Sequence, residues 1–299
     1  MAQLSQSSPI RIIACSATAL LGVPALAVDV LVANPGFENI TGETVFNEFT
    51  FGPPPGWDLW DPGNVTDGGD GPIYYIGTLT PFEPDPIGMP GVYVNFPDGA
   101  SEGIRVGIAF NFAGSGGTGE YGFEQTLNET LAPNTTYVLE VGIGNIATGT
   151  AMSGQKFVLD GFPGYRVELL AGGVLLVQDE NSLRGSIPEG EFATSSVTYT
   201  TGAAHPQLGA PLSIRLVNLN EIDPAFPGSH LEVDFDDVRL TATLACPDLD
   251  SSGAADFGDL LLVLGSWGPC ADCAPDLDGD GVVGFADLLL LLSSWGPCT

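Results

Sequence analysis

The segment Leu231-Glu-Val-Asp-Phe-Asp-Asp-Val-Arg-Leu240 decides the fold class of this chain, because apolar and acidic residues alternate along it. In a β-strand, alternate side chains point to opposite faces. Asp234 and Asp236 are therefore expected on one face of a strand, with Asp237 on the other. Carboxylates this close repel one another unless a cation or a proton intervenes. The segment thus predicts a β-strand whose acids bind a metal or hold a proton.

Similar apolar runs recur upstream and indicate β-structure from residue 28 to about residue 245. Gly, Pro, Asn and Asp separate the runs, as is usual between short strands. The ten expected strands are Ile73–Leu79, Gly91–Phe96, Ile104–Phe112, Phe123–Leu127, Tyr137–Gly142, Tyr165–Leu170, Val174–Val177, Ser196–Thr200, Leu212–Val217 and Leu231–Leu240. No helical period accompanies them, so the sequence predicts an antiparallel jelly-roll β-sandwich. Gly52–Gly56 and Asp61–Pro72 are expected to be loops at one rim.

A duplicated segment follows the β-rich body, because Asp248–Asp259 returns as Asp276–Asp287. Calcium needs about six to eight oxygens, and a twelve-residue loop supplies them with a glycine at position 6. The spacing predicts calcium ligands in both loops: Asp248, Asp250, Ser252, Ala254, Asp256 and Asp259, then Asp276, Asp278, Asp280, Val282, Gly284 and Asp287. The leucine-rich runs Leu260–Leu264 and Leu288–Leu292 are expected to form the helices that leave the loops. The alternative is a pair of acid-rich turns that bind nothing.

Pro247 and Pro275 precede the two loops and disfavour an incoming helix. Each repeat is then a calcium loop of EF-hand type followed by one helix, which resembles the type I dockerins of bacterial surface assemblies. The resemblance implies a cohesin-like or other surface protein as partner. We expect it to contact an apolar surface that the two repeats share, formed by Phe257, Leu261, Phe285 and Leu289. The alternative is that these side chains complete a small core.

The first 27 residues resemble a secretory signal, with Arg11 before the apolar run Ile12–Leu21 and a small-x-small site at Ala25-Leu-Ala27. The run is too short to span a bilayer. The sequence therefore predicts a secreted or cell-surface protein with three parts: a signal at 1–27, a jelly roll at 28–245 and a dockerin-like module at 246–299. The formal net charge of −30 argues against nucleic-acid and membrane partners.

Four of the five cysteines lie in the repeat module, namely Cys246, Cys270, Cys273 and Cys298. In an exported chain this pattern indicates two disulfides. Three pairings are possible, and we favour Cys246–Cys270 with Cys273–Cys298, which joins the loop entrance and the helix exit of each repeat. A zinc site with four thiolates is the alternative.

Several phrases of the body resemble the cyanobacterial Stig cyclases between residues 33 and 242. They are Gly122–Leu127, Gly161–Gly172, Leu212–Leu216 and Val233–Leu240. The resemblance implies a calcium-dependent, dimeric jelly-roll enzyme that rearranges and cyclises isonitrile-bearing indole terpenoids. It implies Asp236 as the acid that protonates substrate. It also implies an aromatic hydroxyl at the position of Phe110, which has none, and structural calcium for which Glu38 and Asp237 are our candidate pair.

The segments Asn34–Glu38 and Pro55–Trp57 resemble the opening of galactose-binding-like and carbohydrate-binding jelly rolls. Trp57, Trp60, Tyr74 and Tyr75 are candidates for a platform on which sugar rings stack, with core packing as the alternative. A polysaccharide ligand is therefore a candidate partner.

The sequence favours an exported, calcium-binding protein whose jelly roll binds a ligand or glycan without catalysis and whose C-terminal module attaches it to a surface partner. A calcium-dependent cyclase, with Asp236 as general acid on a small hydrophobic substrate, is the first alternative. A structural surface component is the second. Catalysis and a homodimer both remain open.

Overall fold

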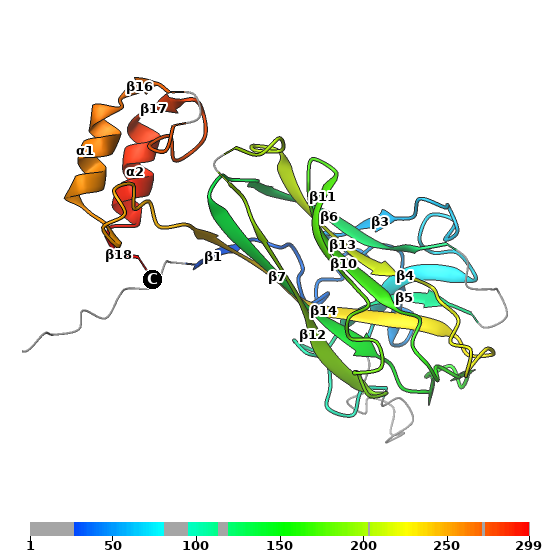
Figure 1. Cartoon of the computed structure of the whole chain (residues 1–299). Coiled ribbons are helices and arrows are strands. Elements are labelled where there is room, and N and C mark those ends of the chain that lie inside the picture. The colour runs from blue at the N-terminus through cyan, green and yellow to red at the C-terminus, as the bar shows by residue number, and fades with distance from the viewer. Residues whose placement is uncertain (1–26, 81–94, 113–118, 203, 271–272, 299) are drawn as a thin grey trace, which may run out of the picture.

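A computed structural model describes residues 27–80, 95–112, 119–202, 204–270 and 273–298. It contains two packed antiparallel β-sheets and, after them, two short helices at one end of the sandwich (Figure 1). None of the helices described is long and apolar enough to cross a membrane. The predicted signal lies outside the described residues apart from Ala27, which begins the first strand.

The larger sheet has seven strands. They are β1 (Ala27–Val30), β2 (Phe49–Phe51), β4 (Tyr74–Leu79), β5 (Val106–Asn111), β7 (Thr135–Asn145), β12 (Glu191–Thr200) and β14 (Leu231–Leu244). Their order is β12-β7-β14-β5-β4-β2, and β1 pairs with the C-terminal part of β14. The alternating segment that predicted a strand therefore lies between β7 and β5, inside the sheet.

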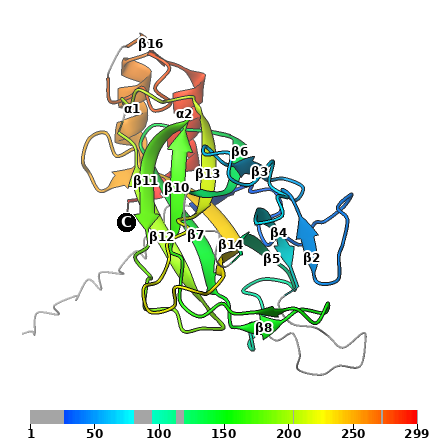
Figure 2. The same ribbon diagram turned by 90° about the vertical axis from the view of Figure 1, so that its right-hand side faces the viewer.

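The second sheet has five strands in the order β11-β10-β13-β6-β3. They are β3 (Asp58–Trp60), β6 (Tyr121–Thr130), β10 (Tyr165–Ala171), β11 (Val174–Glu180) and β13 (Pro211–Asn218). Figure 2 shows the two sheets as separate layers. A two-stranded pair, β8 (Gly149–Thr150) with β9 (Lys156–Phe157), lies outside both.

Nine of the ten predicted runs coincide with observed strands, and the predicted fold class is confirmed. The tenth, Gly91–Phe96, falls largely outside the described residues, and its last two residues are not in a strand. The short strands β2 and β3 were not predicted, because three residues are too few to display a period of two.

The main core lies between the sheets and includes Phe37, which stacks on Trp57 with 5.3 Å between ring centroids. Phe123 packs against Phe37 at 5.1 Å. A buried side chain of this size stabilises the fold by roughly 1.5–3 kcal/mol. Val233 and Phe235 of β14 belong to this core, so the acids that alternate with them point to the opposite face.

That opposite, outer face of the larger sheet is covered by a second apolar cluster. Tyr75, Ile108 and Phe110 of β4 and β5 contribute to it, as do loop residues that include Phe96 and Leu159. The covering loops bury the acids of β14, leaving Glu232 5% exposed and both Asp234 and Asp236 0% exposed. Loop packing, rather than the sandwich interior, thus creates the acidic site.

The C-terminal module contains α1 (Phe257–Gly265) and α2 (Phe285–Ser293), as predicted. Short strands join the repeats crosswise: β15 (Ala254–Ala255) pairs with β18 (Gly296–Pro297), and β16 (Gly268–Pro269) pairs with β17 (Val282–Val283). Each loop therefore contacts the segment that follows the helix of the other repeat. Gly253 and Gly281, at loop position 6, have φ of +90° and +85°, which favours glycine.

The predicted disulfide pairing is wrong, although two disulfides are present. Cys246 is bonded to Cys298 and Cys270 to Cys273, with Cα–Cα distances of 5.6 and 5.7 Å. The reason is the crosswise pairing, which places the exit of α2 beside the entrance of the first loop and the exit of α1 beside the second. Each bond therefore joins the entrance of one repeat to the exit of the other.

Candidate active site

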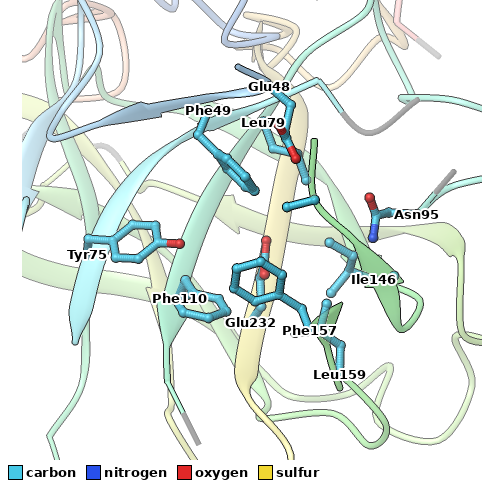
Figure 3. Close-up of a pocket in the computed structure, with 12 residues that line it drawn as sticks. Glu48, Phe49, Tyr75, Leu79, Asn95, Phe110, Ile146, Phe157, Leu159 and Glu232 are labelled. Atoms are coloured by element: carbon cyan, nitrogen blue, oxygen red, sulfur yellow. The ribbon is translucent and has the colours of Figure 1, made fainter. Parts of the chain in front are cut away.

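A small cavity of about 20 Å³ lies on the outer face of the larger sheet (Figure 3). Its lining residues are Glu48, Phe49, Tyr75, Leu79, Asn95, Phe110, Ile146, Gly149, Ala151, Phe157, Leu159 and Glu232. A wider recess of about 320 Å³ adjoins it and shares Phe49, Tyr75, Ala151 and Phe157. Exposed residues such as Phe46 and Phe51 line only the recess, so the recess is the outer part of the site.

Four of the twelve residues that line the cavity are aromatic. Tyr75 and Phe110 are paired in register on β4 and β5, and their ring centroids lie 4.9 Å apart. Phe157 lies 5.5 Å from Phe110, and the ring of His230 lies 5.4 Å from Phe157. Strand alternation places Tyr75 and Phe110 on the outer face, whereas Phe157 reaches the site from β9.

Two buried acids face this aromatic space (Figure 3). Glu232 is 5% exposed, and its Oε1 has no hydrogen-bond partner among the described residues. Glu48 is 6% exposed; its Oε1 accepts a hydrogen bond from the backbone N–H of Met152 at 2.8 Å, while its Oε2 is likewise unpaired. A buried carboxylate without a partner is costly, so such groups hold a proton or face a cation.

Burial raises the pKa of Glu232 to about 8. The pKa of Asp234, two residues along the same face, is well above its usual value because of burial and then the charges of Glu232 and Asp236. Burial, followed by the charges of Glu232 and Glu48, also raises the pKa of Tyr75 well above its usual value. Glu232 therefore carries a proton at neutral pH and can donate it.

Asp236, the acid predicted from sequence, lies elsewhere on the same face. Its Oδ2 accepts a hydrogen bond from the backbone N–H of Glu102 at 2.7 Å, and its Oδ1 accepts one from Asp237 at 2.8 Å. Burial raises its pKa to about 7, but it lines neither the cavity nor the recess. The segment that contains Glu102 covers it. Glu232 lines the cavity instead. The same alternation of apolar and acidic residues that pointed to Asp236 also places Glu232 on that strand face, so the sequence could have identified it.

Calcium binding by Glu38 and Asp237, the predicted pair, remains a prediction. Oε1 of Glu38 accepts hydrogen bonds from the backbone N–H groups of Ile104 and Arg105, each at 2.6 Å. Asp237 has a left-handed φ of +50° next to a register shift in β14, and its carboxylate pairs with Arg239.

The structure does not bring the four residues of the predicted aromatic platform together, because they lie in separate environments. Trp57 is in the main core, 4% exposed, and its Nε1 donates a hydrogen bond to the carbonyl oxygen of Asn34 at 3.0 Å. Tyr74 packs against Tyr121, since neighbours on a strand point to opposite faces. Tyr75 lines the cavity together with Phe110.

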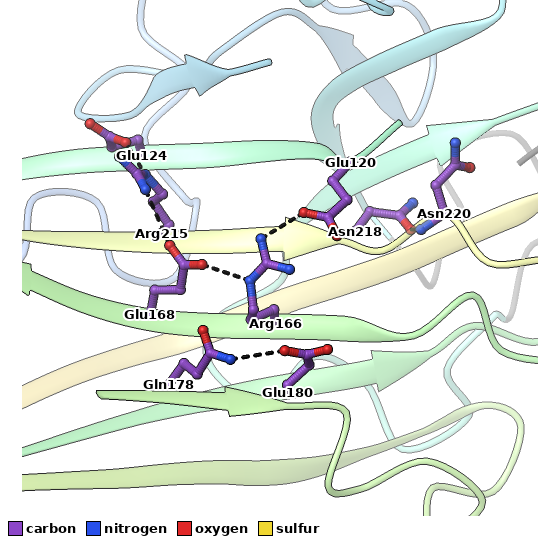
Figure 4. Close-up of polar contacts among 9 residues, drawn as sticks. All are labelled: Glu120, Glu124, Arg166, Glu168, Gln178, Glu180, Arg215, Asn218 and Asn220. Atoms are coloured by element: carbon purple, nitrogen blue, oxygen red, sulfur yellow. Dashed lines mark hydrogen bonds and ion pairs between the residues drawn. The ribbon is translucent and has the colours of Figure 1, made fainter. Parts of the chain in front are cut away.

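Trp60 lies on the outer face of the five-stranded sheet, between Arg166 and Arg215 (ring centroid to guanidinium carbon, 5.9 and 5.3 Å). Arg166 forms ion pairs with Glu120 at 2.7 Å and with Glu168 at 2.6 Å, and Arg215 pairs with Glu124 and Glu168 (Figure 4). This charged network is satisfied internally and is separate from the cavity.

The repeat loops bring three predicted ligands together in each case. The ligand atoms of Asp248, Asp250 and Asp259 lie within 4.8 Å of one another, as do those of Asp276, Asp278 and Asp287. Oδ1 of Asp276 is buried without a hydrogen-bond partner among the described residues, as expected for an atom that binds a cation. Three converging carboxylates around an unpaired oxygen fit calcium.

The other predicted ligands lie outside these acidic triads. Asp256 caps α1 by accepting a hydrogen bond from the N–H of Gly258 at 2.7 Å, and Asp280 accepts one from Val282 at 2.8 Å. The roles of Ser252, Ala254, Val282 and Gly284 remain predictions. The predicted partner-binding residues Phe257, Leu261, Phe285 and Leu289 are 63%, 53%, 67% and 50% exposed, and their contact with a partner also remains a prediction.

The fold is thus a jelly-roll sandwich with a buried acid, Glu232, in the wall of a small cavity that four aromatic rings line. Residues 28–241 match the family model described as HpiC1-like, HpiC1 cyclase. The chain belongs to this cyclase family.

Similar solved structures agree with this assignment. The Stig cyclase Fisc from Fischerella sp. TAU, in complex with (3Z)-3-(1-methyl-2-pyrrolidinylidene)-3H-indole, is 38% identical, with 74% of this chain and 100% of that chain covered and a TM-score of 0.58. A cyclase from Fischerella sp. TAU in complex with 4-(1H-indol-3-yl)butan-2-one is 37% identical, with 73% and 98% covered and a TM-score of 0.57. A comparison with curated proteins gives no match.

These findings correct the function favoured from sequence. A non-catalytic ligand- or glycan-binding body tethered by a dockerin is contradicted, and membership of the cyclase family supports the enzyme alternative instead. The predicted function was based on the repeats, because their sequence pattern is the more regular one. The family match, however, covers the larger β-rich body. The family match ends at residue 241, before the repeats.

Proposed function

We propose that this protein is a cyclase that binds a small, indole-like hydrophobic substrate in the wider recess and protonates it with Glu232, which lines the adjoining cavity. The observation that carries the proposal is a buried carboxyl group with a raised pKa beside an aromatic recess, in a chain of the cyclase family. The solved relatives support an indole-like substrate, because two of them are complexes with indole compounds.

The aromatic wall would contribute binding and water exclusion. Faces of Phe49, Phe112 and Phe157, which line the wider recess, provide apolar contact for a flat ring system. Positive charge that develops on the substrate after protonation would be stabilised by the same aromatic faces. Exclusion of water would protect that charged species from hydrolysis.

Glu232 would act as general acid and then as base. Its low exposure disfavours the carboxylate, so the protonated form persists at neutral pH and can donate to a substrate double bond. The resulting carboxylate can take a proton back when the cyclised product forms. The Tyr75 hydroxyl, near enough for the charge of Glu232 to raise its pKa, can hydrogen-bond to that carboxylate.

We also propose that the two acidic triads of the C-terminal module hold calcium, and that residues 28–245 and 246–299 are separate units. The convergence of the triads and the unpaired Oδ1 of Asp276 support calcium. Bound calcium would neutralise the clustered carboxylates and stabilise loops that the two disulfides also constrain. The sequence features at residues 1–27 support export of the protein.

The test is conversion of an isonitrile-bearing indole terpenoid by the full chain, followed by chromatography and mass spectrometry. We expect a cyclised product of unchanged mass, and we expect Glu232→Gln to lower the rate by at least about a hundredfold. Glu191→Gln, an exposed surface change, is the matched control. Full activity of Glu232→Gln would refute Glu232 as the acid. Absence of any cyclised product, with 4-(1H-indol-3-yl)butan-2-one also failing to bind, would refute the proposed function.

A further inference from the structure

The small cavity holds one more acid than the proposed proton transfer uses. Glu48 lines it from the segment before β2, and Glu232 lines it from β14 (Figure 3). Both side chains are more than nine-tenths buried. Oε2 of Glu48 and Oε1 of Glu232 have no hydrogen-bond partner among the described residues. Because an unpaired buried oxygen is costly, each of these atoms needs a hydrogen-bond donor.

The size and the lining of the cavity fit one water molecule. The cavity encloses about 20 Å³, and a site needs roughly 10–15 Å³ of such volume to hold a water. A buried water makes about two to four hydrogen bonds with polar groups around it. The two carboxyl oxygens can accept its two hydrogens, and Tyr75 and Asn95 are further lining residues whose side chains carry hydrogen-bonding groups.

Resting on the proposed function, we propose that Glu48 is a positioning residue for catalysis, which acts on Glu232 through a single ordered water in this cavity. The water donates one hydrogen to Oε2 of Glu48 and the other to Oε1 of Glu232. Oε1 of Glu48 accepts a hydrogen bond from the backbone N–H of Met152 at 2.8 Å, in the turn between β8 and β9. Glu48 is thereby fixed, and it holds the water at a defined place beside the acid.

The hydrogen bond from this water becomes stronger when Glu232 gives up its proton. Before transfer, Oε1 of Glu232 belongs to a neutral carboxyl group; after transfer to the substrate, it shares a negative charge. A hydrogen bond to a charged acceptor is roughly twice as strong as one to a neutral acceptor. The water therefore stabilises the carboxylate as it forms, which lowers the barrier to proton transfer. When the cyclising substrate returns a proton to Glu232, the starting state is restored.

The titratable groups around Glu232 decide how a test must be designed. They are Glu48 from the segment before β2, Tyr75 from β4, Tyr121 from β6, and His230 and Asp234 from either side of Glu232 in sequence. Any neutral replacement of Glu48 also removes its charge, so two neutral replacements must be compared. Glutamine keeps an oxygen for the N–H of Met152 and an amide group for the water. Methionine has a similar length, but its thioether is only a weak acceptor.

The experiment measures kcat and KM of the full chain with the isonitrile-bearing indole terpenoid across a range of pH. We expect kcat of Glu48→Met to be at least about tenfold below that of Glu48→Gln. KM should differ by less than about twofold, because Glu48 does not line the recess that binds the substrate. Glu191→Met, a change at an exposed residue of β12, is the matched control and should alter neither constant.

The pH profile separates this role from a purely structural one. Activity needs protonated Glu232, so kcat should fall as pH rises through the pKa of that group. The fall should lie about one pH unit higher in Glu48→Met than in Glu48→Gln, because the Glu232 carboxylate loses a hydrogen-bond donor only in the methionine variant. Equal kcat and equal pH profiles in the two variants would overturn the inference and leave the proposed function in place.

High-resolution crystal structures give a readout that does not depend on activity. We expect a water within hydrogen-bonding distance of both glutamate oxygens in the unaltered protein, a water at the same place in Glu48→Gln, and a dry cavity in Glu48→Met. A dry cavity in the unaltered protein would overturn the inference whatever its activity. Absence of cyclised product from the unaltered protein would remove the proposed function, and the catalytic role of Glu48 with it.

Discussion

Tyr75 on β4 is paired in register with Phe110 on β5, and their ring centroids lie 4.9 Å apart at the wall of the cavity. The resemblance to Stig cyclases implied an aromatic hydroxyl at the position of Phe110, which this chain lacks. Tyr75 brings a hydroxyl to the same wall from the neighbouring strand, and the charge of Glu232 raises its pKa. We infer that Tyr75 on β4 supplies the hydroxyl group that Phe110 on β5 lacks.

Tyr75→Phe should lower the cyclisation rate by about tenfold to a hundredfold, because the Glu232 carboxylate loses a hydrogen-bond donor during proton transfer. The melting temperature should change little, since phenylalanine fills the same space. Adding Phe110→Tyr should restore part of the rate, and initial rates of the two variants check this. An unchanged rate in Tyr75→Phe would show that the hydroxyl is not used.

Stability should fall as pH rises from about 4.5 to about 8, because burial raises the folded-state pKa of Glu232 from 4.5 to about 8. The folded state holds this proton more tightly than the unfolded state. The stability that protonated Glu232 contributes is therefore complete below the pKa of the unfolded state and is lost as the pH rises through the pKa of the folded state. The change should be on the order of a few kcal/mol. Urea denaturation at several pH values should give a shallower dependence for Glu232→Gln than for Glu191→Gln, and equal slopes would contradict the assignment.

Trp57→Ala should destabilise the protein by about 3–5 kcal/mol, because it removes a 4% exposed ring that stacks on Phe37 in the main core. Trp60→Ala should cost only about 1 kcal/mol, since that ring lies on the outer sheet face beside two arginines. Chemical denaturation of both variants measures the difference. Similar losses in the two variants would be inconsistent with this placement.

Peptide mapping without reduction should recover Cys246 linked to Cys298. This bond spans 52 residues and the Cys270–Cys273 bond spans 3, so the longer one constrains the unfolded chain far more. Serine substitution of the pair Cys246 and Cys298 should destabilise the repeats by about 2 kcal/mol more than substitution of the other pair. Recovery of Cys246 linked to Cys270 would restore the pairing expected from sequence.

Asp287→Asn should abolish calcium uptake at the second loop, because Asp287 belongs to the triad with Asp276 and Asp278. Asp280→Asn, outside the triad, should weaken uptake much less. Calcium titration of the full chain should show one site lost in the first variant, and hydrogen exchange of residues 246–298 should rise when calcium is chelated. Identical titrations for the two variants would argue against the triad as the binding unit.

Local periodicity was enough to predict most elements of this protein. The alternation in residues 231–240 identified β14, and the leucine-rich runs after each acidic loop identified α1 and α2. The spacing of Asp248, Asp250 and Asp259 anticipated a triad that the structure brings together. These patterns succeed because strand faces, helix faces and short loops depend on residues only a few positions apart.

Tertiary structure alone decided which acid, which aromatic rings and which cysteines act together. Glu232 and Asp236 share one strand face, yet different loops cover them, so only Glu232 lines the cavity. Tyr74 and Tyr75 are adjacent but lie on opposite sides of a sheet, and Cys246 meets Cys298 only because the repeats pair crosswise. Each of these outcomes depends on contacts between segments distant in the chain, and no local pattern specifies them.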